Sequence, residues 1–298
     1  MSVQQTLQDV NTLNNTFNDL NDELREILES KEIEVGDNYS LNQMKDLLNN
    51  PDILFVKTEF KVRLYYCDFD TDKIYELNPD TLGTINEGDA LGKYPRGTGG
   101  GWDGGKVRLY LANGDKNEIY ELNPNTLQLI KTVECPSHAP MGIGGGFNGD
   151  KLRLFHCDFY IGEIYELSPD TLTTIKVVSG TSSHPISVGG SWNGSKFRLY
   201  YVDSNERKIY ELNTDTLGEV KTVRSASNFP TGIGGGYDGI RLRLYHTDSD
   251  IDKIYELNPD TLGAIKTIDS TSPHPYDIGG GYDVISHARY NSEVIYLP

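Results

Sequence analysis

The chain has 298 residues, with 27 basic and 44 acidic side chains and a formal net charge of −17. A surface this acidic repels phosphate backbones and anionic lipid, so the charge argues against a nucleic-acid partner. The 31 glycines and 19 tyrosines suit β-structure with many turns better than a helical protein.

Three cysteines, Cys67, Cys135 and Cys157, show neither metal-ligand spacing nor a disulfide framework. We expect free thiols in a protein that folds in a reducing cytosol. The first residues show neither a basic stretch nor an apolar core, so we expect no secretory leader, and no apolar run approaches membrane-spanning length. We therefore predict no membrane insertion, no bound metal and no cofactor.

Residues 2–31 lack glycine and proline and are predicted to form a helix. Their apolar residues recur at spacings of three and four, close to a heptad pattern, opposite a polar face. Such a narrow stripe needs partners in water, so residues 1–31 are predicted to be a coiled-coil stalk. We favour a homotrimer over a dimer, and a single helix packed on the rest of the chain is the alternative. The predicted oligomerisation residues are Leu7, Val10, Leu13, Phe17, Leu20, Leu24 and Ile27.

Residues 32–52 change character. A short alternating piece at 33–35 is followed by a Gly-Asp-Asn turn, and Ser40 then has the position of a helix N-cap. The short helix predicted over 41–48 ends before Pro51. We interpret this segment as a connector between the stalk and a head.

An internal repeat dominates the remainder of the chain. The phrase IYELNPDTL begins at Ile74 and returns, with small changes, at Ile119, Ile164, Ile209 and Ile254. Each step equals 45 residues, as in 119 − 74 = 45. A clipped copy, 295–298, ends the chain. A constant period means that each repeat is one copy of the same supersecondary unit.

Each repeat contains four short segments of strand type joined by tight turns. In the third repeat these are 140–147, 151–156, 164–167 and 173–178. Four antiparallel strands in a repeat of about 40–50 residues are typical of a β-propeller blade.

Six blades fit the landmarks best. The strand that begins at Lys61 recurs in every repeat, and a degenerate sixth instance lies at 287–290. Residues 53–59 align with a sixth first strand that lacks the glycines. We therefore predict a mainly β fold, a six-bladed propeller over residues 53–298, preceded by the α-helical coiled coil. Five blades closed by a C-terminal strand are the main alternative.

Several side chains repeat with the same period. The glycine runs are followed by strands and not by helices, so they do not match a phosphate loop, and we expect them to line the central channel. Arg63 and Glu76 begin two series that are predicted to pair within or between blades. The aromatics after the glycines are expected to pack between blades, with sugar stacking as the alternative: Trp102, Phe147, Trp192, Tyr237 and Tyr282.

Propeller geometry brings two loops of each blade to one rim. The loop before each glycine strand has a proline in every repeat, but the residues beside this proline differ between repeats. This variation indicates either ligand specificity or drift. The candidate ligand-binding residues are Tyr94, Arg96, His138, His184, Phe229, His274 and Tyr276. The second loop begins with an acid or amide, either to cap the loop or, in a ring, to hold a cation: Asp68, Asn113, Asp158, Asp203 and Asp248.

The repeat pattern resembles the YVTN and NHL-type propeller repeats over about residues 53–298. That resemblance implies the fold, because such propellers serve as lectins, scaffolds and enzymes alike. Residues 2–50, in which the stretch 24–35 is followed by a turn and by the segment 41–48, are similar to the start of tail-fibre and minor tail proteins of phages of Gram-positive bacteria.

Together these resemblances imply a phage receptor-binding protein located in the virion tail and synthesised in the host cytoplasm. Its N-terminus would attach to other tail proteins, and its propeller would bind host surface glycan without catalysis. A structural adaptor of the tail or baseplate is one alternative. A lactonase-like propeller hydrolase is another, but no chemically unique carboxylate or histidine cluster is recognisable in the sequence.

Overall fold

The computed structural model describes residues 55–179, 182, 184–290 and 293–296. These residues form strands and turns and contain no helix, so none of them forms a helix that could cross a membrane. The predicted stalk, with its oligomerisation residues between Leu7 and Ile27, and the predicted connector lie outside the described residues. The chain divides into two compact units, Glu59–Val284 and a smaller one made of Met1–Thr58 with Ile285–Pro298.

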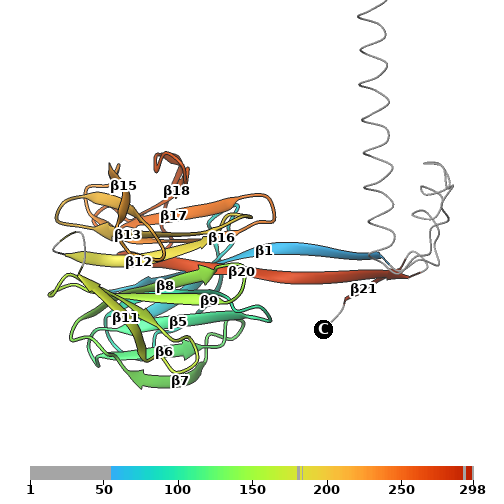
Figure 1. Ribbon diagram of the computed structural model, residues 1–298, viewed down its shortest axis with the longest axis horizontal. Helices are drawn as coiled ribbons and strands as arrows, with labels where there is room; N and C mark the ends of the chain where they lie inside the picture. The colour runs from blue at the N-terminus through green and yellow to red at the C-terminus, as the bar shows by residue number, and fades with distance from the viewer. Residues whose placement is uncertain (1–54, 180–181, 183, 291–292, 297–298) are drawn as a thin grey trace, which may run out of the picture. The chain divides into compact units, whose positions relative to one another are not determined.

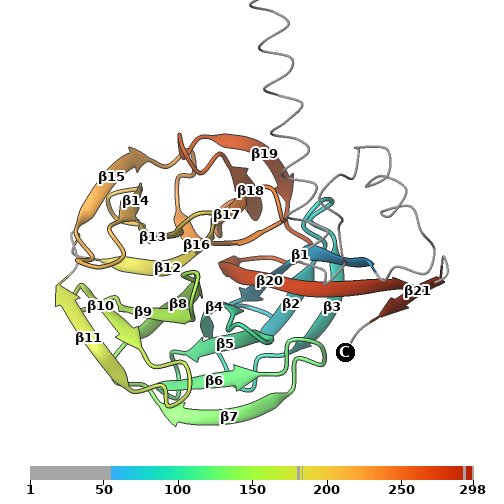
Figure 2. The same cartoon turned by 45° about the vertical axis from the view of Figure 1, so that its right-hand side comes forward.

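The larger unit is a ring of five sheets (Figures 1 and 2). The glycine-rich segments form the innermost strand of each sheet. These strands are β4 (Pro95–Trp102), β8 (Pro140–Phe147), β12 (Pro185–Trp192), β16 (Pro230–Tyr237) and the first part of β20 (Pro275–Tyr290). The next strand outward is the one with the repeated arginine: β1 (Phe55–Asp68), β5 (Val107–Asn113), β9 (Leu152–Asp158), β13 (Phe197–Asp203) and β17 (Leu242–Asp248).

The IYEL phrase forms the third strand of each sheet: β2 (Lys73–Leu77), β6 (Glu118–Leu122), β10 (Glu163–Leu167), β14 (Lys208–Leu212) and β18 (Lys253–Leu257). The outer strands, on the circumference in Figure 2, are β3 (Thr84–Asp89), β7 (Leu129–Glu134), β11 (Thr174–Ser179), β15 (Glu219–Arg224) and β19 (Ala264–Asp269). The antiparallel register confirms the predicted four-stranded blade.

The predicted count of six blades is wrong, because the described residues form five. Strand β20 carries the fifth glycine run and joins the sheet of β1, β2 and β3, in the order β21-β20-β1-β2-β3. Strand β20, near the C-terminus, therefore completes the first blade, as in the alternative with five blades. Residues 55–59 are the beginning of β1 and not a separate first strand.

The C-terminal residues that suggest a sixth blade in the sequence form a hairpin, and this hairpin lies in the smaller unit. The end of β20 pairs with β21 (Glu293–Tyr296), with His287 opposite Tyr296 and Tyr290 opposite Glu293. These two strands pair with each other and contribute no additional blade.

The glycines of the innermost strands allow the blades to approach backbone to backbone. A Cβ on Gly144 of β8 would lie 2.7 Å from the carbonyl oxygen of Val188 on β12. A Cβ on Gly279 of β20 would lie 2.5 Å from the carbonyl oxygen of Thr98 on β4, so the same contact occurs where the ring closes. The predicted channel-lining role of the glycines is confirmed.

The aromatics that follow the glycines pack against the turn of a neighbouring blade. A Cβ on Gly149 would lie 3.2 Å from the ring of Trp192, and one on Gly194 would lie 3.1 Å from the hydroxyl oxygen of Tyr237. The expectation that these rings pack between blades is therefore confirmed for these positions.

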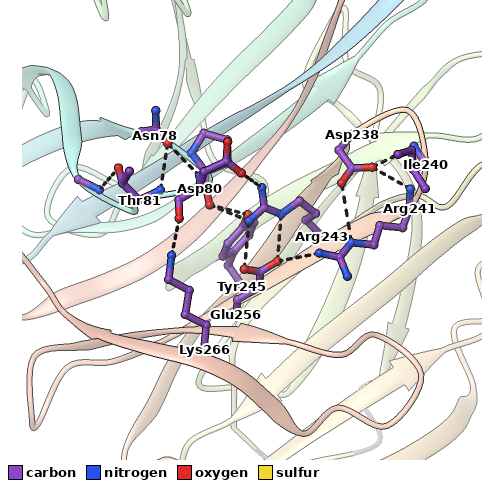
Figure 3. Close-up of polar contacts among 12 residues, drawn as sticks. Asn78, Asp80, Thr81, Asp238, Ile240, Arg241, Arg243, Tyr245, Glu256 and Lys266 are labelled. Atoms are coloured by element: carbon purple, nitrogen blue, oxygen red, sulfur yellow. Dashed lines mark hydrogen bonds and ion pairs between the residues drawn. The ribbon is translucent and has the colours of Figure 1, made fainter.

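The repeated arginines tie each blade to the next. Within a blade, Arg108 Nε lies 2.9 Å from Glu121 Oε1, and equivalent pairs occur in the other four blades. Towards the next blade, Arg108 Nη1 donates to Asp170 and Nη2 donates to the carbonyl of Pro169. We call this arrangement the arginine latch, and Figure 3 shows the instance at which the ring closes, between Arg243 and Asp80.

Candidate functional site

Both variable loops of a blade lie at one end of its sheet. Pro95 pairs with Asn113, and Pro140 pairs with Asp158, so each innermost strand begins where the second strand ends. The same register holds for Pro185 with Asp203 and for Pro230 with Asp248. We call this end of the propeller the variable rim.

The acids that begin the second loop cap it and bind the first loop. Asp158 Oδ1 accepts hydrogen bonds from the backbone N–H groups of Tyr160 and Ile161, and Oδ2 accepts from those of His138 and Ala139. Burial acts to raise the pKa of Asp158, but these four donors outweigh it and hold the pKa below its ordinary value.

The capping interpretation of the acid series is confirmed by the same pattern in other blades. Asp248 Oδ2 accepts from Ser227 Oγ and from the backbone of Asn228 and Phe229. Asp68 Oδ1 caps its own loop, and its Oδ2 accepts from Ser272 Oγ. Within the described part of the chain, no three acids, histidines or cysteines lie close enough together to hold a metal ion.

A cavity of about 270 Å³ opens at the variable rim. All five blades contribute to it, because its lining runs from Arg96 on β4 through His138 and Ile186 to Phe229 and to Tyr276 on β20. Phe159 and Tyr160 of the β9–β10 loop and Ser204 and Asn205 of the β13–β14 loop complete its polar and aromatic wall. We call this cavity the rim pocket.

The rim pocket unites four of the seven predicted ligand-binding residues: Arg96, His138, Phe229 and Tyr276. The other three lie outside its lining. Tyr94 packs on Phe69, with ring centroids 4.8 Å apart, and His274 Nδ1 lies 2.6 Å from Asp70 Oδ2. His184 packs against Phe159, at a centroid distance of 5.0 Å.

Sequence reasoning missed the aromatic pair of the second loop. Phe159 and Tyr160 line the rim pocket, and Tyr160 is 79 % exposed. A signal was present, because the residues equivalent to Tyr160 in the other blades are Asp70, Asp115, Asn205 and Asp250.

A unique buried carboxylate was also missed. Asp277, next to the pocket residue Tyr276, stands where the other repeats have Gly97, Gly142, Ser187 and Gly232. Its Oδ1 accepts a 2.6 Å hydrogen bond from Ser187 Oγ, and its Oδ2 accepts from the backbone N–H of Thr98 at 2.9 Å. Ser187 Oγ also accepts from the N–H of Ile233.

Asp277 therefore joins innermost strands of different blades across the channel. Burial raises the pKa of its carboxyl well above the ordinary value, and the hydrogen bonds that it accepts oppose this effect. Only 1 % of the residue is exposed, so its oxygens are committed to protein donors and do not face the pocket.

A second arrangement brings a histidine, a serine and a cysteine together in the protein interior. His156 Nε2 lies 2.7 Å from Ser137 Oγ and 3.5 Å from Cys135 Sγ, while its Nδ1 lies 3.1 Å from the carbonyl oxygen of Gly142. All these side chains are buried, and blade 5 repeats the arrangement with Ser225 and His246. A sealed pair that occurs twice serves packing, because a nucleophile must be reached by its substrate.

Because these two histidines are buried, we predict that the protein loses stability in acid. Burial lowers the pKa of both His156 and His246 to about 4, against about 6.5 in an unfolded chain. The unfolded chain then binds more protons between these values, so the stabilising effect is complete above about pH 6.5 and is lost as the pH falls towards 4. We expect a difference of about 2 kcal/mol per histidine between pH 7 and pH 4.5, measured by urea unfolding at both pH values.

The control for this prediction is His246→Tyr, which copies Tyr66 at the equivalent register of blade 1. It should reduce the difference in stability between the two pH values by about half of the histidine effect. An unchanged difference would contradict the assignment.

No model of a known protein family matches the sequence, and no curated protein matches it. Solved structures with a similar fold include one from a nidogen/laminin complex, with 14 % identity and a TM-score of 0.49 over 73 % of this chain and 97 % of that chain. Virginiamycin B lyase from Staphylococcus aureus has 16 % identity and a TM-score of 0.42, covering 79 % of this chain and 77 % of that chain.

Glutaminyl cyclase from Myxococcus xanthus has 12 % identity and a TM-score of 0.47 over 68 % of this chain and 89 % of that chain. All three likenesses have TM-scores below 0.5, so they carry no argument about the fold, which rests on the strand order described above. They carry no argument about activity, because similarity this distant does not extend to the residues of a site.

Proposed function

We propose that the propeller is a non-catalytic head that binds host-cell-surface glycan, in a receptor-binding protein of the phage tail-fibre type. The observation that carries the proposal is the rim pocket, which all five blades build, largely from positions at which the repeats differ. The repeats are nearly identical elsewhere, and they differ in the loops that would contact a bound ligand. Attachment through residues 1–52 and a place in the virion tail remain predictions.

The lining of the rim pocket suits a saccharide. Phe159, Tyr160, Phe229 and Tyr276 offer aromatic faces, while Ser204 and Asn205 offer hydrogen-bonding groups. Ligand sites commonly combine an apolar, aromatic wall with a few polar groups that orient the ligand. Phe229 is 43 % exposed, so its ring is accessible from the rim.

The absence of catalysis is part of the proposal. Glycoside hydrolysis ordinarily uses two carboxyl groups that flank the bond, and no carboxylate is among the described residues that line the pocket. Asp277 is engaged by donors from other blades, and the two Ser–His pairs are buried. A glycosidase of the ordinary two-carboxylate kind would need such carboxyl groups to face the ligand.

A structural adaptor is the second candidate. Its partner would cover the aromatics of the variable rim, of which Tyr160 is 79 % exposed in the single chain. A competition experiment separates the two functions. A soluble saccharide should release the propeller from a glycan, and it should not release the propeller from a protein that covers the whole rim.

Binding to an array of bacterial surface saccharides tests the proposal. Tyr160→Ala and Phe229→Ala should each weaken binding of the glycans retained by the unaltered protein by about 1 kcal/mol, roughly five-fold, because each removes an aromatic face. Ile240→Ala is the matched control, since Ile240 is 87 % exposed in the β16–β17 turn at the other end of the blade. It should bind as the unaltered protein does.

Two results would oppose this proposal. If no saccharide is retained, the glycan function is wrong. If bound glycan is cleaved during incubation, as judged by new reducing ends, the head is catalytic and the proposed absence of catalysis is wrong.

A further inference from the structure

The rim pocket differs in charge from the rest of the protein. The chain has 44 acidic and 27 basic residues, yet the pocket lining contains Arg96 and no aspartate or glutamate. The four residues equivalent to Arg96 in the other repeats are uncharged: Met141, Ile186, Thr231 and Tyr276. A single cation therefore stands in an acid-free pocket of an acidic protein.

Arg96 is held in place by groups that leave its charge unbalanced. Its Cζ atom lies 5.5 Å from the centroid of the Phe69 ring, and its Nη1 donates to Met141 Sδ at 3.3 Å. A Cβ on Gly114 would lie 2.3 Å from Arg96 Cδ and Nε, so the side chain packs directly on the backbone of that loop. Among the described residues, no carboxylate lies within 4.0 Å of its guanidinium nitrogens.

The other buried or half-buried arginines on the described strands each have a carboxylate as counter-ion. Arg63, Arg108, Arg153, Arg198 and Arg243 each lie 2.6–2.9 Å from a glutamate of their own blade. A partly desolvated cation without such a partner is costly. An anionic ligand group would supply the missing partner with charge-assisted, bidentate hydrogen bonds.

We propose that the rim pocket binds an acidic saccharide, one that carries a carboxylate or a phosphate, and that Arg96 is the counter-ion of that group. The inference rests on the proposed glycan-binding function and names its ligand class. Phe159, Tyr160 and Phe229 then contact the apolar faces of the sugar, while Arg96 determines the charge of the residue that is accepted. The net charge of −17 opposes a long polyanion, so the selected feature is one acidic sugar unit.

The test uses the whole protein and an array with three classes of saccharide: uronic-acid-bearing, phosphate-bearing and neutral. The unaltered protein should retain one of the acidic classes, and which of the two it retains identifies the anionic group. The best acidic ligand and its neutral counterpart, the methyl ester or the dephosphorylated sugar, are then titrated by calorimetry. We expect the acidic form to bind at least about ten-fold more tightly.

Variants separate the charge of Arg96 from its packing. Arg96→Met should weaken binding of the acidic ligand about ten-fold or more and change binding of the neutral counterpart less than about two-fold. Arg96→Lys should restore part of the preference, because it keeps the charge but loses the bidentate geometry. Arg207→Met is the matched control, since Arg207 is exposed in the β13–β14 loop of the same rim and does not line the pocket.

The two proposals fail in different ways. Equal binding of acidic and neutral ligands, or an unchanged preference in folded Arg96→Met, overturns the role of Arg96 and leaves the glycan function standing. Retention of no saccharide of any class overturns both.

Discussion

Replacing Arg243 by methionine should lower the free energy of unfolding by about 3 kcal/mol. Arg243 Nε lies 2.9 Å from Glu256 Oε1, and its Nη2 donates to Glu256 Oε2 and to the carbonyl of Pro79 (Figure 3). The Glu256 side chain is only 6 % exposed, so the substitution leaves a nearly buried carboxylate without its partner. Arg241 Nη2, at 3.8 Å, is too distant for a hydrogen bond and compensates only in part. Urea unfolding at pH 7 measures the effect.

Two further variants identify the cause. In Arg243→Met/Glu256→Leu the buried charge is gone, so much of the lost stability should return. Asp80→Ala removes only the outer part of the latch, and since the Asp80 side chain is 80 % exposed it should cost less than about 1 kcal/mol. If the double variant were no more stable than Arg243→Met, an uncompensated carboxylate would not be the reason.

A single methyl group on the innermost strand should be at least as damaging. In Gly145→Ala the new Cβ would lie 2.0 Å from the carbonyl oxygen of Arg153 on the paired strand β9. Neither backbone can move without breaking the β8–β9 ladder or the contact with the next blade. We expect a loss of about 3 kcal/mol or more, or failure to fold, measured by thermal unfolding and by the yield of soluble protein.

Gly105→Ala is the matched control. Gly105 lies in the turn between β4 and β5, and the nearest atom to its added Cβ is Asp103 Oδ1 at 3.7 Å. This substitution should change stability by less than about 1 kcal/mol. Equal effects of the two substitutions would show that loss of glycine flexibility, and not the clash, is responsible.

The blade could be predicted from one repeat because its interactions are local. Alternating strands, Asn-Gly turns and the Asn-Pro-Asp turn specify an antiparallel meander whose hydrogen bonds join segments adjacent in sequence. The turn phrase also has a role that its repetition alone did not reveal. The carbonyl of Pro169 and the carboxylate of Asp170 receive Arg108 of the preceding blade, so the conserved spacing serves the contact between blades.

The number of blades could not be derived in the same way. The chain contains five glycine runs and five complete arginine strands, and residues near both ends imitate a further copy. Whether β20 begins a sixth sheet or completes the sheet of β1 depends on how the packing angle between blades closes the ring. That angle arises from contacts such as Gly279 with Thr98, which join residues far apart in the sequence.

The rim pocket, too, could be predicted from the sequence only in part. Divergence between repeats identified Arg96, His138, Phe229 and Tyr276, because positions released from the repeat are visible in the sequence. Divergence also marked Tyr94 and His274, which pack outside the pocket lining. In both loops the residue has a positive φ, 58° for Tyr94 and 55° for His274, and its N–H is bound by an aspartate, Asp72 or Asp252.

The sequence by itself therefore determined the blade, its strand order, the shared rim and the glycine-lined channel, since each follows from a period and from short-range pairing. Tertiary structure alone decided that five blades close the ring, that Asp277 is consumed by strands across the channel, and that Arg96 has no carboxylate beside it among the described residues. The physical reason is that ring closure and the charge around a pocket depend on contacts between several blades, and the sequence of a single repeat does not include these contacts.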